Sequence, residues 1–367
     1  MAAARTLLAR VRGRLPRSVA GRHLLAVLIG LVVVFFALEL TSPYRNAQLA
    51  TMAYYAIAAT GLTVLTGLNG QISLGHGALM AVGAYTTALL LDGDGISFGL
   101  AMLLATVVTA AVGTVIGAAA ARLHGPYLAG ATLALAVGLP GLANHFDGLL
   151  GGEQGLRVDS PRPPDWFADA IYFLSANDTG PVKYLAYIGW LSLLVVLLLL
   201  ANLMAGRYGR VWRAVRDDEV AAELAGIRLG RVRVLAFVVS AACAGLAGSV
   251  LGMVVRLAAP SAFTVVLSLS LLTAVVVGGL GSLTGALLGS ALLVFLPPAV
   301  TSVGITSGLS DVQAAQLAPF IYGVVLVLVM LLAPGGVLGI CKRIWHGFGR
   351  RRAEPAQPSE NLEKEAA

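Results

Sequence analysis

The sequence predicts an all-α protein that crosses a lipid bilayer many times. Of its 367 residues, 58% are hydrophobic and only 12% are charged, whereas a soluble domain carries about 25% charged residues. Apolar stretches of about 20 residues, the length that crosses the hydrocarbon core of a membrane, recur along the chain. Between them, Lys and Arg gather in short runs, which is typical of the cytoplasmic segments of a membrane protein.

Ten apolar stretches have roughly the length of a membrane-spanning helix. They are residues 24–40, 47–66, 71–91, 97–121, 127–147, 182–203, 234–255, 264–280, 282–300 and 314–333. Glycine blurs the ends of the third, eighth and ninth stretches. The sequence therefore predicts about ten transmembrane helices within one membrane domain at residues 24–340.

The basic residues predict how this domain is oriented. With the N-terminus in the cytoplasm, twenty of the 25 Lys and Arg residues fall in cytoplasmic segments, namely 1–23, Arg122, 204–233 and 334–367. The five on the outer side are Arg45, Arg157, Arg162, Lys183 and Arg256. Shifting the order by one span would scatter the basic runs to both sides, so an even number of spans with both termini inside is expected.

The two terminal segments carry their own signals. An Arg-rich start, residues 1–23, precedes the first apolar stretch, as in a secretory signal, but that stretch ends in Leu38-Glu39-Leu40 without a small-x-small cleavage site. A retained first helix is expected. Residues 341–367 are mostly polar and contain proline, which predicts a largely disordered cytoplasmic tail.

The segment 67–85, GLNGQISLGHGALMAVGAY, lies between apolar stretches yet is rich in glycine and polar residues. Irregular polar backbone survives at membrane depth only where it lines a cavity or another helix. We therefore predict a broken segment beside a transport pathway, or one that braces neighbouring helices. The pathway candidates are Gln71, Ser73, Gly75, His76 and, next to a kink expected at Pro140, Asn144.

Two segments between spans are long enough to have functions of their own. Residues 148–181, with prolines at 161, 163 and 164 and with Trp166, are predicted to pack over the outer mouth. Residues 206–233, here called the elbow, have apolar positions at helical spacing with Arg opposite. They predict two short amphipathic helices with a turn near Asp217-Asp218 and Asp218 as an N-cap. The elbow is either a docking element for a cytoplasmic subunit or a solvated or lipid-facing connector.

Glycines at four-residue spacing allow two membrane helices to approach closely. Gly281, Gly285 and Gly289 are expected on one helix face, and Gly248 and Gly252 repeat the spacing in the seventh span. Packing within the chain is the favoured interpretation, and a contact with a second permease is the alternative.

Five motifs, in their order along the chain, resemble those of the LivM-type permeases of bacterial branched-chain amino acid ABC importers. They are TGLNGQISLGHGALMAVGAY (66–85), TLALAVGLPGLANHFDGLLGGEQGL (132–156), GRYGRVWRAVRDDEVAAELAGI (206–227), VVVGGLGSLTGALLGSALL (275–293) and LLAPGGVLG (331–339). The resemblance implies the type II architecture of the vitamin-B12 importers, in the plasma membrane. It also implies a homologous LivH-type permease, two ATP-binding cassette subunits and an external substrate-binding protein as partners.

The resemblance places an ATPase-coupling motif in the elbow, at Glu219, Ala221, Ala222 and Gly226. We expect Arg216, Asp217 and Glu219 to make polar contacts there, since exposed charges beside small residues suit the rim of an interface. After Thr132-Leu133-Ala134, relatives commonly carry an acidic and then a basic residue, where this chain has Val137 and Pro140. A branched-chain amino acid is the expected substrate, with urea, short amides or aromatic acids as alternatives.

Several other functions are disfavoured by what the sequence lacks. None of its lysines, Lys183, Lys342 and Lys364, follows a phosphate-binding glycine loop, so the chain is not expected to hydrolyse ATP. An ion-coupled transporter would place carboxylates within the spans, and a membrane enzyme would need converging acidic or histidine residues. The histidines are dispersed and the two cysteines, Cys243 and Cys341, are expected to be packing residues, so no metal site or cofactor is predicted. The basic runs have no interleaved aromatic residues, so the expected partner is membrane lipid and not nucleic acid.

Overall fold

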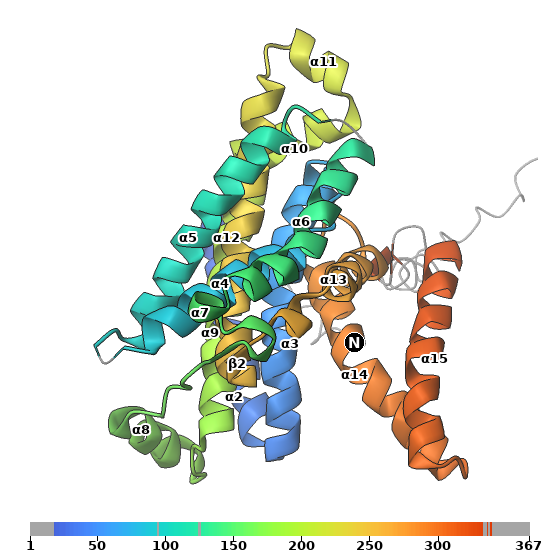
Figure 1. The fold of residues 1–367 in the computed structure, drawn as a ribbon. Coiled ribbons are helices and arrows are strands. Elements are labelled where there is room, and N and C mark those ends of the chain that lie inside the picture. The colour runs from blue at the N-terminus through green and yellow to red at the C-terminus, as the bar shows by residue number, and fades with distance from the viewer. Residues whose placement is uncertain (1–17, 94, 124–125, 333–335, 337, 340–367) are drawn as a thin grey trace, which may run out of the picture.

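The computed structural model describes residues 18–93, 95–123, 126–332, 336 and 338–339 (Figure 1). Residues 1–17 of the basic N-terminus and the whole 341–367 tail, with Cys341, lie outside the described residues. The described chain is mostly helical, so the predicted all-α class is confirmed.

Eight helices of the described chain are long and apolar enough to cross a membrane. They are α2 (Val19–Glu39), α3 (Pro43–Leu62, extended by the π-helix η1, Thr63–Leu68), α5 (Phe98–Ala120), α6 (Pro126–His145), α9 (Pro181–Ala205), α12 (Leu229–Val255), α13 (Val265–Gly278, preceded by η3, Pro260–Phe263) and α14 (Leu283–Thr306). The third and tenth predicted stretches form α4 (His76–Leu91) and α15 (Asp311–Leu332). Every predicted stretch therefore corresponds to a helix.

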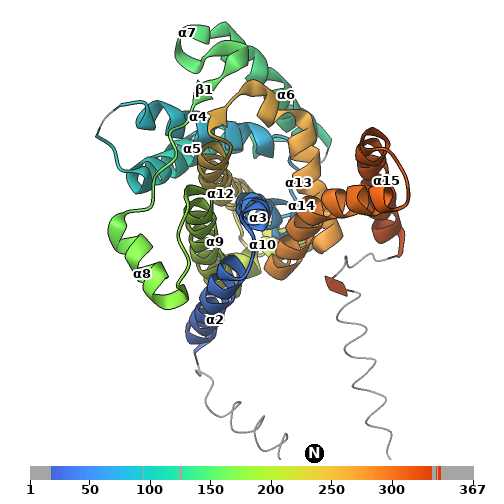
Figure 2. The same cartoon turned by 90° about the horizontal axis from the view of Figure 1, so that it is seen from below.

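Helices α3 and α12 form the centre of the bundle (Figure 2). Helix α12 packs against α3, α4 and α5, and small residues let the backbones approach closely. A Cβ on Gly248 of α12 would overlap the Met80 carbonyl of α4, and one on Gly83 of α4 would overlap Gly245 of α12. At the periphery, α2 packs mainly on α9, and α15 packs mainly on α14. Their remaining apolar faces are suited to lipid or to another chain.

The loop 148–181 folds into small elements at one end of the bundle, here called the loop end (Figure 1). It contains η2 (Gly152–Gln154), β1 (Leu156–Arg157) and α8 (Asp165–Ser175), after the single turn α7 (Asp147–Leu150). Strand β1 pairs antiparallel with β2 (Leu257–Ala258), with Leu156 opposite Ala258. The strand pair therefore fixes the loop to the end of α12. Helix α8 lies to the side, where Phe167 packs on the rings of Tyr184 and Tyr187.

A buried ion pair joins α2 to α9 at the loop end. Lys183 Nζ lies 2.5 Å from Glu39 Oε2, and their side chains are only 10% and 4% exposed. The Tyr187 hydroxyl donates to the other carboxylate oxygen of Glu39 over 2.7 Å. Lys183 and Glu39 thus neutralise one another at the ends of two apolar helices.

The structure corrects the glycine face predicted near residue 285. Gly281 is not in α14; it lies in the turn before that helix, with φ of +77°, against the backbone of Gly67. Helix α14 begins at Leu283, and the Ser282 hydroxyl caps it by accepting from the Gly285 amide. The four-residue spacing continues by coincidence into a turn that needs a positive φ. Gly285 and Gly289 face α13, close to the carbonyls of Gly278 and Ala274.

Candidate functional site

The chain loses its helical path between α3 and α4, and residues 63–75 are here called the break. The α-helix first widens into η1, whose end is marked by a bond from the Asn69 amide to the Val64 carbonyl. Gly70 then adopts φ of +76°, which a residue with a side chain rarely adopts. The Gln71 amide returns to the Leu65 carbonyl at 3.1 Å, and α4 begins at His76.

The break and the first residue of α4 carry buried polar side chains at the positions that the sequence singled out. Gln71, Ser73 and His76 are all buried, and one ring nitrogen of His76 lies 3.1 Å from the Ala58 carbonyl. Other buried polar atoms have no hydrogen-bond partner within the described chain: Thr63 Oγ1, both amide atoms of Asn69, Gln71 Oε1 and His76 Nδ1. Because buried polar atoms are nearly always paired, such a concentration indicates a site for water or a polar solute.

Asn69 and Thr63 were not among the sequence candidates. Asn69 stands directly before Gly70, and asparagine beside glycine is common in turns, so the sequence does not indicate that its amide is buried. Thr63 precedes the glycine-rich stretch, so no motif marks it. It is the first residue of the π-helix, and its buried hydroxyl has no hydrogen-bond partner in the described chain.

Two other helices hold the break and the start of α4 in place. From α6, the Thr132 hydroxyl accepts from the Leu74 amide at 3.0 Å, and a Cβ on Gly75 would press on the Thr132 carbonyl. From α13, the Ser268 hydroxyl accepts from the Gly77 amide at 2.9 Å. The segment therefore braces its neighbours, as the second sequence interpretation predicts, and it also carries unpaired polar groups.

Asn144 lies apart from the other pathway candidates. It is exposed near the far end of α6, twelve residues beyond Thr132, which is about 18 Å along a helix. Helix α6 runs through Pro140 to His145, where the ring of His145 packs on Phe146. The structure therefore does not bring Asn144 together with Gln71, Ser73 and His76.

The elbow forms two short helices, α10 (Arg207–Asp217) and α11 (Glu219–Leu224), at the bundle end opposite the loop (Figure 1). The predicted turn and cap are confirmed, because the Asp218 carboxylate accepts from the amides of Val220 and Ala221 at 2.9 and 3.0 Å. Trp212 is fully buried and donates to the Val232 carbonyl at 3.2 Å. Sequence reasoning missed this anchor, although it lies between Val211 and Val215 in the apolar stripe.

Helix α11 leaves apolar side chains uncovered. Leu224 is 85% exposed and Val220 is 69% exposed, while Ala222 is buried. Gly226 follows with φ of +84°, and no atom lies within 4 Å of the position a Cβ would take. Ala221 is exposed beside them. Glu219 instead pairs within the chain, at 2.6 Å from the nearly buried Arg233.

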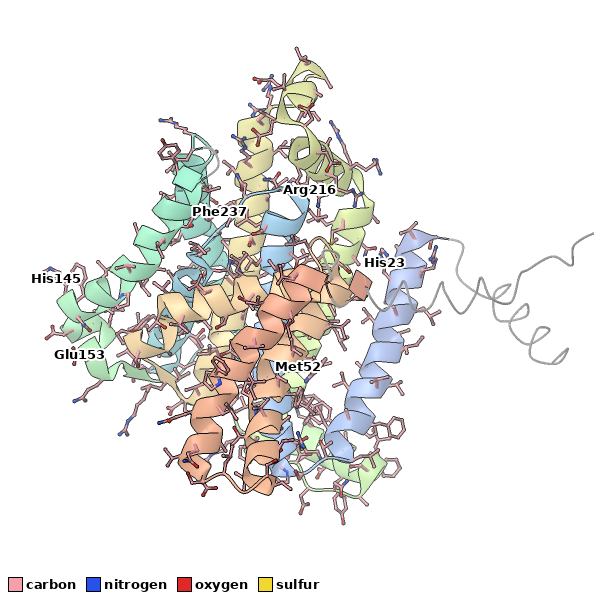
Figure 3. All side chains as sticks on the ribbon, turned by 90° about the vertical axis from the view of Figure 1, so that its right-hand side faces the viewer. His23, Met52, His145, Glu153, Arg216 and Phe237 are labelled. Atoms are coloured by element: carbon pink, nitrogen blue, oxygen red, sulfur yellow. The ribbon has the colours of Figure 1, made fainter. Side chains whose placement is uncertain are left out.

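Arg216 joins the elbow to the break (Figure 3). Its guanidinium donates to the Gly67 carbonyl at 2.6 Å, and its side chain lies against Gly70. Asp217 holds the same guanidinium at 3.2 Å from the exposed side. Gly67 in turn contacts the backbone of Gly281, so this bond links α10, η1 and the α13–α14 turn.

Within the described chain, no group of three His, Cys, Asp or Glu is placed to hold a metal ion.

Known proteins resemble this chain over most of its length. The LivM permease protein of a high-affinity branched-chain amino acid transport system from Salmonella typhimurium is 33% identical over 281 residues, which are 73% of this chain and 66% of the relative. LivM of Escherichia coli is 31% identical over the same shares. LivH of Salmonella typhimurium is 28% identical over 78% of this chain and 91% of the relative. No solved structure matches.

The chain thus spans just under two thirds of the length of the LivM proteins. Residues 44–332 match the family described as branched-chain amino acid transport system / permease component. That range begins in the first turn of α3 and ends with α15, so it contains the break, the loop and the elbow. The chain belongs to this family of branched-chain amino acid transport permease components.

Proposed function

We propose that this chain is the permease subunit of an ABC importer for branched-chain amino acids. It would form half of a pathway with a LivH-type permease, take substrate from an external binding protein and be driven by two ATP-binding cassette subunits. About ten transmembrane helices in a type II arrangement, with both termini cytoplasmic, complete the proposal. Its main support is the Arg216–Gly67 hydrogen bond, which joins the elbow directly to the break.

The proposed sequence of events starts at the loop end, outside the cell. The binding protein docks there and releases its amino acid. At the elbow, the exposed Val220 and Leu224 suit burial in a cleft of a partner subunit. When ATP draws the partner subunits together, α10 and α11 move with them. Arg216 then carries the displacement to Gly67 and shifts the hydrogen-bonding groups of Gln71, Ser73 and His76.

An ion-coupled transporter is the second candidate, and one observation favours it. His76 is fully buried, with one ring nitrogen lacking a partner in the described chain, and buried histidines can relay protons. No residue of the break itself, 63–75, carries a titratable side chain. Protons alone would then drive uptake, without nucleotide.

The test uses the complete transport complex in sealed vesicles. Arg216→Gln keeps a polar side chain but removes the charge-assisted bond to the Gly67 carbonyl. We expect ATP-driven leucine uptake to fall about tenfold, a typical size for lost coupling between two sites. The ATP-binding subunits should still copurify with the variant. The matched control, Arg210→Gln, removes the same charge from α10, where the exposed guanidinium only approaches the Ala205 carbonyl at 3.4 Å.

Two results would overturn the proposal. The first is leucine accumulation by purified wild-type chain that is free of any ATPase, driven by a proton or sodium gradient. The second is uptake by Arg216→Gln that equals uptake by both the wild type and Arg210→Gln.

A further inference from the structure

A cavity of about 450 Å³ lies between α3, α13 and α14. Small-molecule sites typically measure about 300–1,000 Å³. Thr51 and Tyr55 of α3 form one wall, and Leu293 and Val294 of α14 form another. Pro297 and Pro298 lie one turn further along α14, also against the cavity.

The paired prolines leave two backbone carbonyls of α14 without their usual donors. In an α-helix, the carbonyl of residue i accepts from the amide of residue i+4, and proline has no amide hydrogen. Pro297 therefore leaves the Leu293 carbonyl free of that bond, and Pro298 does the same for Val294. These two residues line the cavity. A carbonyl that lacks its helical amide donor is a strong hydrogen-bond acceptor in an apolar surrounding.

Hydroxyl groups supply the other polar atoms of the cavity. Tyr55, Thr264 and Ser270 line it, as does Thr51, whose hydroxyl already donates to the Ala47 carbonyl at 3.0 Å and so presents an acceptor. Val266 and Leu267 add an aliphatic surface. The residues that line this cavity include no charged side chain.

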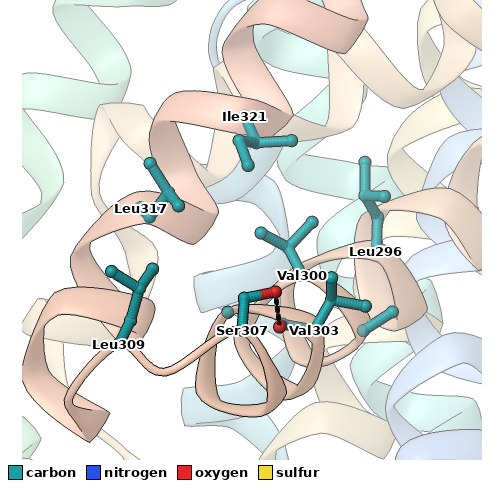
Figure 4. A pocket seen from close by; sticks show the side chains of 9 residues that line it. Leu296, Val300, Val303, Ser307, Leu309, Leu317 and Ile321 are labelled. Atoms are coloured by element: carbon teal, nitrogen blue, oxygen red, sulfur yellow. Dashed lines mark hydrogen bonds between the residues drawn. The ribbon is translucent and has the colours of Figure 1, made fainter.

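Two other cavities of similar volume lack this chemistry. The cavity of about 430 Å³ between α14 and α15 is lined almost wholly by aliphatic side chains (Figure 4). Its serine, Ser307, donates to the Val303 carbonyl of its own helix. A cavity of about 390 Å³ between α5, α9 and α12 is lined by Thr106, Cys243 and aliphatic residues. Polar and apolar walls are combined only in the cavity beside the prolines, among these three.

We infer that the cavity at Tyr55 and Pro297-Pro298 binds a zwitterionic amino acid with an aliphatic side chain. The ammonium group would donate to the Leu293 and Val294 carbonyls, and the carboxylate would accept from the hydroxyls of Tyr55 and Ser270. Val266 and Leu267 would contact the aliphatic side chain. The inference rests on the proposed function, and it assigns the substrate a resting place distinct from the break.

The position of the cavity supports an order of events. Tyr55 precedes Thr63, the first residue of η1, by eight residues, or about 12 Å along a helix. The cavity is therefore on the loop-end side of the break. An amino acid released at the loop end would reach the cavity first and Gln71, Ser73 and His76 second.

The experiment uses a diazirine analogue of leucine that crosslinks under light to whatever it touches. It is applied to the wild-type transport complex, and labelled peptides are mapped by mass spectrometry. We expect label within 264–270 and 293–298, removed by excess leucine but not by excess lysine, whose side-chain charge has no partner there. Combining Tyr55→Phe with Pro297→Ala and Pro298→Ala should lower labelling at least about tenfold, since hydrogen bonds to charged groups are lost.

Matched variants separate these losses from general damage. Tyr127→Phe removes the hydroxyl of an exposed tyrosine, and Pro319→Ala removes an exposed proline from α15. Both should label like the wild type. Label confined to other peptides, or label unaffected by excess leucine, would overturn the inference. If the wild-type complex shows no ATP-driven leucine uptake, the proposed function fails as well; uptake with label elsewhere overturns only the cavity.

Discussion

Gly248 and Gly252 lie one turn apart on α12 and meet different surroundings. A Cβ at residue 248 would overlap the Met80 carbonyl of α4, whereas one at residue 252 would lie 3.5 Å from Val158, an ordinary contact. Overpacking a tight contact costs about 1–3 kcal/mol. We expect Gly248→Ala to lower the melting temperature of the purified protein clearly and Gly252→Ala to leave it nearly unchanged. Equal losses would mean that the α4–α12 contact is looser than described.

The Glu39–Lys183 pair makes a second prediction at the residue scale. Glu39→Gln leaves the Lys183 ammonium, only 10% exposed, without its counter-charge. Breaking a buried pair on one side costs about 3–5 kcal/mol of unfolding free energy. We expect a large fall in melting temperature, partly recovered when Lys183→Met removes the second charge as well. Glu153→Gln, at an exposed position of the loop, is the control and should have no effect.

Single residues were predictable from the sequence where one local rule decides. Asp218 was predicted as an N-cap from its place between two amphipathic segments, and it caps α11. Gln71, Ser73 and His76 were expected beside a break because polar residues at membrane depth need one. The face given to Gly281 was wrong, because spacing alone does not show where a turn interrupts a helix. The role of Trp212 depends on the Val232 carbonyl, twenty residues along the chain, which no local pattern reveals.

At the scale of the element, α11 and its terminal Gly226 allow a sharper test of the elbow. Gly226 has φ of +84° with open space around it, so alanine there adds backbone strain of about 1–2 kcal/mol but no clash. Tryptophan adds the same strain and a bulky ring beside Leu224. We expect Gly226→Trp to abolish ATP-driven uptake and Gly226→Ala to reduce it only slightly, with membrane insertion unchanged in both. Full uptake by the tryptophan variant would contradict a coupling role.

Whole elements were predictable wherever hydrophobicity alone fixes them. Each apolar stretch gives a helix, and most ends differ from the prediction by a few residues. The π-helix η1 was not predicted; it places Gly67 against Arg216 and Gly281, which are distant in the sequence and which no local pattern reveals. The inner structure of the loop was missed for a related reason. Strand β1 exists only because the distant residues 257–258 pair with it.

For the whole molecule, the distribution of charge predicts which side each end faces. In a background of Cys243→Ala and Cys341→Ala, one new cysteine is placed at Glu153 in the loop or at Glu223 in α11, both exposed. We expect an impermeant maleimide to label Glu153→Cys in intact spheroplasts. Glu223→Cys should react only after the membrane is opened. The reverse pattern would place the elbow outside and remove the basis for ATPase docking.

The overall class followed from composition and periodicity, but the arrangement of helices did not. Hydropathy alone does not indicate that α3 and α12 occupy the centre while α2 and α15 lie at the edge, since all four helices are apolar on average. Nor does hydropathy show that Asn144 is remote from Gln71, because both lie in glycine-rich stretches. Distances between helices depend on which small residues meet, and that is a property of pairs of helices.

The two-residue strand pair has a consequence for communication across the membrane. It fastens the loop to the end of α12, a 27-residue helix whose first turn leads out of the elbow. A ligand that tilts α12 at the loop end changes the affinity of the elbow end for its own partner. By linkage, that partner changes the affinity for the ligand by the same factor. If the proposed partners bind at these two ends, a binding protein on the loop and nucleotide-binding subunits on the elbow should each change the affinity of the other by the same factor.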